Sequence, residues 1–160
     1  DCLVGSEMCI RDSLFGDLIG KFELSSVLDG IVVGNDHNLH ITTLDVDGQK
    51  LIVPGLPGKL NNEVRVRIRS RDILLSSSRL KSKITENELE GFISTIEIEK
   101  NSAFSELVIF LKNLKKNKNI QKLRARITTY NLKKMELSRN DTVFIYISSV
   151  SIDRQAYQST

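Results

Sequence analysis

Cysteine is almost absent from this sequence of 160 residues. Its two cysteines, Cys2 and Cys9, both lie within the first 13 residues. The rest of the chain therefore has neither a disulfide framework nor a metal site built on cysteine. Absence of cysteine is compatible with a reducing compartment.

Other absences exclude further classes of function. No stretch of about 18 apolar residues occurs, so the sequence predicts no membrane-spanning helix. The phosphate-cradling motif Gly-x-x-x-x-Gly-Lys-Ser/Thr and the ABC signature are both missing. The only histidines, His37 and His40, are interpreted as solvated loop residues, because a metal site needs more ligands at defined spacing. The chain is expected to be no enzyme and to hold no metal or cofactor.

Basic residues gather in two runs, at 65–71 and 112–122, within a chain of net charge +3. Nucleic-acid binding favours aromatic side chains interleaved with basic ones. Aromatic residues make up 6% of the chain, and neither run contains one. Residues 63–69 alternate apolar residues with arginines, which predicts an amphipathic strand with a solvated face. A basic stripe for a partner or an anion is the alternative.

The order of apolar and polar residues along the sequence is mostly that of short β-strands. Asp47-Gly48 predicts a tight hairpin turn. Thr128 is expected to cap a short helix over 129–135, with Leu132 and Met135 facing the core. The polar stretch 76–83 is expected to be a connector. Apolar alternation and β-branched runs predict strands at 26–33, 39–46, 50–54, 63–69, 89–98, 106–112, 123–127 and 142–152.

Two blocks of the sequence share a weak internal symmetry. The first opens with Leu28-Asp29-Gly30 and the second with Leu89-Glu90-Gly91. A handful of short strands per block, with one helical turn, is typical of a small OB-like barrel. The predicted fold class is therefore all-β with one short helix, arranged as two OB-like subdomains.

The order of several motifs resembles the C-terminal TOBE/Mop-like regulatory region of the ATP-binding subunit of molybdate ABC importers. The first three motifs of that region are strands, and the last two belong to a molybdenum-binding-protein-like (Mop) subdomain. The matching residues here are Leu39–Leu44, Leu51–Pro54, Arg65–Ile73, Ala125–Thr128 and Ile147–Val150.

The resemblance implies a division of the chain. Residues 24–80 would form a first TOBE-like β subdomain and residues 84–154 a Mop-like OB-fold subdomain. Residues 14–23 would be a remnant linker after a missing ATPase domain, and residues 155–160 a tail. Residues 1–13 resemble translated sequencing-adapter sequence and are not expected to belong to the fold.

The resemblance also implies an oxyanion site at a subunit interface, built from hydroxyls, backbone N–H groups and cations. Ile84 and Glu86 stand where the family has Ser and Arg, and Ser148 stands where it has Lys. The hydroxyl part of the site is thus expected to be kept and the cationic part lost. Alternatively, the hydroxyls only cap the helix and occupy a strand. The implied oxyanion-binding residues are Thr128, Asn131, Ser149 and Arg126.

The implied function is that of a regulatory and dimerisation domain of a molybdate or tungstate importer, sensing cytoplasmic oxyanion. The domain would form a homodimer through its Mop-like part, without membrane insertion or nucleic acid. The parent protein would hydrolyse ATP with Mg²⁺ on the missing domain and pair with a membrane permease, peripheral to the inner membrane in the cytoplasm. Alternatives are a free-standing Mop-type storage protein, a structural TOBE domain of another ABC importer, and an OB-fold nucleic-acid binder.

Overall fold

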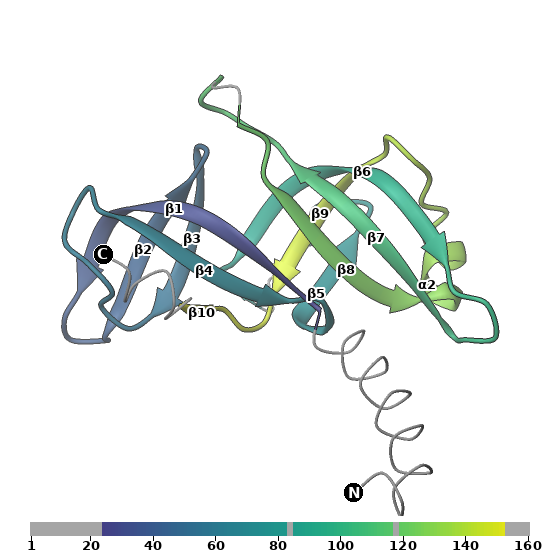
Figure 1. The fold of residues 1–160 in the computed structure, drawn as a ribbon, viewed down its shortest axis with the longest axis horizontal. Helices are drawn as coiled ribbons and strands as arrows, with labels where there is room; N and C mark the ends of the chain where they lie inside the picture. The colour runs from purple at the N-terminus through teal and green to yellow at the C-terminus, as the bar shows by residue number, and fades with distance from the viewer. Residues whose placement is uncertain (1–23, 83–84, 117–118, 153–160) are drawn as a thin grey trace, which may run out of the picture.

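The computed structural model describes residues 24–82, 85–116 and 119–152, which form two antiparallel five-stranded sheets (Figure 1). Each sheet curls into a half-barrel, and one short α-helix lies at the end of the second. This confirms the predicted fold class. The predicted adapter segment 1–13, linker 14–23 and tail 155–160 lie outside the described residues, as does Ile84.

The first sheet has the strand order β10-β4-β1-β2-β3. Alternating side chains bury one face, so that Leu28, Leu44 and Val66 are fully buried. Asp47 and Gly48 both have positive φ, as the predicted tight turn requires. The strands of this sheet are β1 (Ser25–Asp36), β2 (Ile41–Val46), β3 (Gln49–Pro54), β4 (Glu63–Arg69) and β10 (Ser151–Ile152).

The second sheet has the order β5-β9-β6-β7-β8, and α2 (Thr129–Lys134) follows β8. The hydroxyl of Thr128 accepts a hydrogen bond from the Asn131 backbone N–H at 3.2 Å, which confirms the predicted helix cap. Leu132 is buried, and Met135 packs against the core. The strands are β5 (Ile73–Ser76), β6 (Glu88–Ile98), β7 (Phe104–Leu111), β8 (Lys122–Thr128) and β9 (Thr142–Ile147); the 3-10 turn η1 (Ser70–Asp72) precedes β5.

Two short strands cross between the halves, which corrects one local prediction. Residues 142–152 are not one closing strand, because the chain leaves β9 after Ile147 and its end, β10, pairs with β4 of the first sheet. Conversely, β5 leaves the first block and pairs with β9. Ser148 N–H donates to the Asp72 carbonyl at 3.0 Å where the two crossings meet. The division into domains at residues 80 and 84 remains a prediction.

The internal symmetry of the sequence is also a symmetry of the fold. β1 and β6 are both central strands, and each begins near a Leu-x-Gly motif. Each also carries an irregularity at the equivalent place, between Val32 and Gly34 in β1 and between Ile93 and Thr95 in β6. The two sheets are therefore repeats of one plan, and the fifth strand of each comes from the other repeat.

Two glutamines join the halves reciprocally. The Gln121 side chain accepts from Asp29 N–H at 2.7 Å and donates to the Asp29 carbonyl at 2.9 Å. Gln49 makes the same two bonds to the backbone of Glu90, at 2.7 and 3.0 Å. Each glutamine amide thus pairs with both backbone groups of one residue in the opposite half, as a neighbouring strand would.

Asn87 adds a third amide contact of the same kind between the halves. It accepts from Ile52 N–H at 2.7 Å and donates to the Ile52 carbonyl at 2.8 Å. Because β3 is an edge strand, this contact also covers an edge that would otherwise be open to pairing.

Tyr146 supports the chain that leaves β5. Its side chain is 2% exposed, and its hydroxyl accepts a hydrogen bond from Leu80 N–H at 2.8 Å. Burial raises the pKa of this phenol above its ordinary value. The folded state therefore favours the neutral form, and unfolded tyrosine loses its proton first as the pH rises through about 10.

We expect Tyr146 to add an alkaline loss of stability. The free energy of unfolding should fall above about pH 10, and this part of the fall should vanish in Tyr146→Phe. At neutral pH the variant should lose about 1 kcal/mol through the missing hydrogen bond. Urea unfolding between pH 7 and 11 measures both effects. Tyr130→Phe, at a side chain that is 71% exposed, is the control, and an identical pH profile for the two variants would contradict this assignment.

Candidate functional site

Thr128 and Asn131 lie together where β8 passes into α2. Thr128 is half-buried and Asn131 is exposed. The Thr128 oxygen is occupied as a cap acceptor, but its hydroxyl proton remains able to bond an acceptor. This end of the second sheet therefore presents a hydroxyl and an amide to an incoming group.

Arg126 lies near the same end of β8, but its charge is already matched. Its guanidinium forms an ion pair with Glu99, and the two side chains are only 6% and 12% exposed. The guanidinium carbon also lies 4.5 Å from the centre of the Phe104 ring. This packing favours a structural role for Arg126, because a carboxylate of its own chain already lies on the charge that an oxyanion would need.

Ser149 lies far from these three residues. Thr128 pairs with Phe104, at the far end of β7, whereas Tyr146, near the end of β9, pairs with Glu88 at the start of β6. The length of β6, on the order of 30 Å, separates the two ends. Figure 1 shows the same separation, with α2 at one end of the sheet and the β9–β10 connection at the other. The structure thus brings together Thr128, Asn131 and Arg126 and places Ser149 apart.

Two of the positions that depart from the family pattern, Glu86 and Ser148, lie close to Ser149. Ser148 uses both its N–H and its hydroxyl on the Asp72 carbonyl, at 3.0 and 3.2 Å. Ile147 N–H donates to the Asn87 carbonyl at 3.0 Å, so the exposed Glu86 lies beside the end of β9. A carboxylate here disfavours an oxyanion electrostatically.

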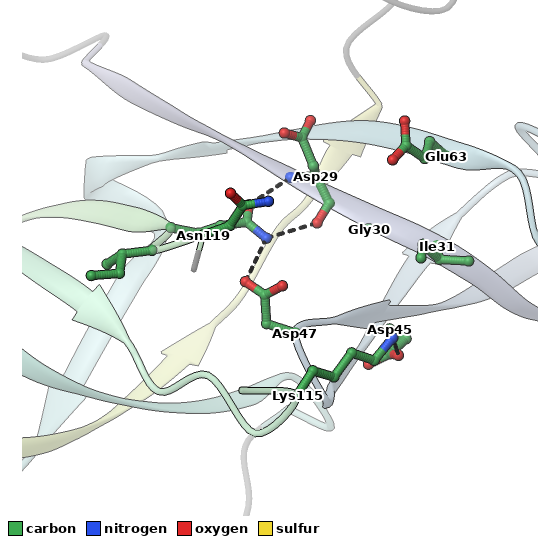
Figure 2. A pocket seen from close by; sticks show the side chains of 10 residues that line it. Asp29, Gly30, Ile31, Asp45, Asp47, Glu63, Lys115 and Asn119 are labelled. Atoms are coloured by element: carbon green, nitrogen blue, oxygen red, sulfur yellow. Dashed lines mark hydrogen bonds and ion pairs between the residues drawn. The ribbon is translucent and has the colours of Figure 1, made fainter. Parts of the chain in front are cut away.

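A pocket of about 500 Å³ lies between the first sheet and the β7–β8 hairpin (Figure 2). The Gln121 amide crosses it and donates to the Asp47 carboxylate at 3.0 Å, and Lys115 pairs with Asp45. Its lining includes four carboxylates, which disfavour an oxyanion, and contains none of the four predicted site residues. In the part of the chain that the structure describes, no three His, Cys, Asp or Glu side chains are grouped to hold a metal ion. The carboxylates lining it are Asp29, Asp45, Asp47 and Glu63.

Comparison with known proteins connects this fold to molybdate transport. No family model matches the chain. Two curated relatives do: the molybdenum import ATP-binding proteins ModC of Rhizobium johnstonii and Rhizobium etli, 24% and 25% identical over 139 residues. The match covers 82% of this chain and 35% of each relative. The chain is a distant homologue of the C-terminal third of ModC.

The ModC homology confirms the resemblance that the sequence motifs indicated. The chain spans about a third of the length of these curated relatives. Among solved structures, the cytoplasmic molybdate-binding protein ModG with molybdate bound shares the fold at 17% identity and a TM-score of 0.63. That likeness covers 79% of this chain and 94% of the ModG chain. Within the described ranges, no helix is long and apolar enough to cross a membrane.

Proposed function

We propose that this chain is the regulatory and dimerisation domain of an ATP-binding subunit in a molybdate or tungstate importer. The observation that carries the proposal is the ModC homology, which extends over 82% of the chain. In this proposal, ATP hydrolysis and the permease contact belong to other parts of a longer protein. The domain works in the cytoplasm, and its subunit is held at the inner membrane by the permease.

The oxyanion site of this proposal is shared between two copies. One copy supplies Thr128 and Asn131, and its partner supplies Ser149, because these residues lie at opposite ends of one sheet. A small dianion needs several short hydrogen bonds at once, so neither end suffices alone. Oxyanion binding and dimerisation then strengthen each other by the same free energy, which gives the transporter a signal of cytoplasmic oxyanion.

Calorimetric titration of the full chain with molybdate, tungstate and sulfate tests this function, with light scattering to measure the dimer fraction. We expect saturable binding of molybdate and tungstate, weaker binding of sulfate, and a dimer fraction that rises with molybdate. Thr128→Val and Ser149→Ala should each weaken binding, whereas Thr128→Ser keeps both hydroxyl and cap and should bind normally.

Mixing the two weakened variants provides a sharper test of sharing. A hybrid dimer contains one site with both changes and one site with neither, so a re-equilibrated mixture should regain about one quarter of the normal sites. If each site were built within a single chain, the mixture would regain no normal sites. Absence of oxyanion binding by the folded chain would leave only a structural and dimerising role.

A free-standing storage protein is the second candidate, favoured by the coverage of 94% of the ModG chain. The reading frame upstream of residue 14 discriminates between the two. An in-frame nucleotide-binding motif supports the importer subunit, and a start codon supports the storage protein.

A further inference from the structure

A groove of about 410 Å³ lies between the start of β1 and the outer face of β6, β7 and β8. It shares no residue with the acidic pocket or with the predicted oxyanion site. Its lining combines hydroxyls, apolar side chains and two cations, and includes no carboxylate. The lining residues are Ser25, Ser26, Val27, Ser94, Thr95, Val108, Phe110, Lys122 and Arg124.

The two cations of this groove are available to a ligand. Lys122 Nζ lies 5.3 Å from the centre of the Phe110 ring, and among the described residues it forms no ion pair. Arg124 contacts Glu106 at 3.3 Å, but its side chain is 51% exposed. An exposed, long ion pair of this kind contributes little, so Arg124 can exchange Glu106 for another anion.

Two hydroxyls of the groove are arranged to donate. The Ser25 oxygen accepts from an Arg67 guanidinium N–H at 3.0 Å, and the Ser26 oxygen accepts from Arg124 N–H at 2.8 Å. A hydroxyl that accepts from nitrogen still carries its own proton. The Arg124 N–H lies on the outer edge of β8. Because Ser26 already accepts from it, pairing of a peptide strand with that edge is disfavoured.

An apolar strip runs directly beside the cations. Phe110 pairs across the ladder with Lys122, and Val108 pairs with Arg124. Cross-strand neighbours on one face lie about 5 Å apart, so each cation stands next to an apolar surface. Val27, 41% exposed, faces this strip from β1. The groove is larger than a bare tetrahedral oxyanion needs and lies in the size range of sites for small organic molecules.

We propose that this groove binds a small organic anion, with its charged group on Lys122, Arg124 and the Ser25 hydroxyl and its apolar body on Val27, Val108 and Phe110. The shared chemistry is a sulfonate, phosphate or carboxylate attached to an apolar or aromatic group. This site is separate from the oxyanion site of the proposed function and does not depend on it.

Fluorescence titration of the full chain with 8-anilinonaphthalene-1-sulfonate tests the groove, since this probe combines a sulfonate with an aromatic body. We expect saturable binding of one probe per chain, and Lys122→Gln should weaken it roughly tenfold, the loss of one charge-assisted contact. Competition with phenyl phosphate and with benzoate identifies the preferred charged group. Inorganic phosphate should compete poorly because it lacks the apolar body.

Lys134→Gln is the matched control, because Lys134 also lies over an aromatic ring, 5.8 Å from the centre of Tyr130. It should bind the probe as the unchanged chain does. The neutral analogue N-phenyl-1-naphthylamine should bind more weakly, and Lys122→Gln should not alter its binding. Equal probe affinity in the two lysine variants, with circular dichroism showing both folded, would overturn the proposal. Molybdate titration of Lys122→Gln should be normal, which separates this site from the oxyanion site.

Discussion

Arg126→Ala is expected to destabilise the fold by about 3 to 5 kcal/mol, the cost of leaving one member of a buried ion pair without its partner. The Glu99 carboxylate is 12% exposed and would lose the cation that compensates its burial. The Phe104 ring would also lose the guanidinium packed on it. Urea unfolding monitored by circular dichroism measures the change.

Arg124→Ala provides the matched control, two residues earlier on the same strand. Its ion pair with Glu106 is exposed, and we expect a loss within about 1 kcal/mol. Arg126→Ala combined with Glu99→Ala should recover part of the loss, since the carboxylate that paired with Arg126 is then absent as well. If Arg126→Ala instead weakened molybdate binding at unchanged stability, Arg126 would be a ligand-binding residue and our structural assignment would be wrong.

Gly91→Ala is expected to cost about 3 kcal/mol, at the upper end of what overpacking a core costs. A Cβ at this position would lie 2.6 Å from the Phe110 carbonyl oxygen and 2.9 Å from Ile109 Cγ2. Backbone oxygen cannot turn aside as a side chain can, so β6 and β7 would have to separate. The thermal unfolding midpoint should fall, and the same variant should expose more apolar surface.

Gly30→Ala tests the equivalent position of the first repeat. There the nearest atom to an added Cβ is Leu44 Cβ at 3.1 Å, so the neighbours have to move much less than at Gly91, and we expect a loss of about 1 kcal/mol. Gly34→Ala meets nothing nearer than 4.0 Å and should be almost neutral. Equal losses at Gly91 and Gly30 would show that the close carbonyl is not the cause.

Much of the fold could be predicted because its signals are local. The alternation along β4, the Asp47-Gly48 turn and the Thr128 cap each depend on residues within a few positions of one another. The exchange of β5 and β10 could not be predicted in this way. Periodicity shows that a segment is a strand, but it carries no information about the sheet that the strand joins.

The candidate site shows the same limit. The motif order placed Thr128, Asn131, Arg126 and Ser149 in one site, and only the strand register reveals that Ser149 lies at the opposite end. The partner of Arg126 is 27 residues away in sequence, with no local signal that connects the two. Likewise, a search for aromatic residues within the basic runs missed Phe110, which reaches Lys122 only across the β7–β8 ladder.

The crossing of β5 and β10 has a consequence for how a shorter polypeptide of this kind would assemble. A polypeptide holding only residues 85–152 would keep four strands of its sheet and carry a fifth with no sheet of its own to join. In a pair of such polypeptides, the last strand of each copy would join the sheet of the other copy. The product would be an intertwined dimer with the shape of the present single chain. Joining the two copies in one reading frame replaces a concentration-dependent encounter with a covalent tether, so that the intertwined form persists at any dilution.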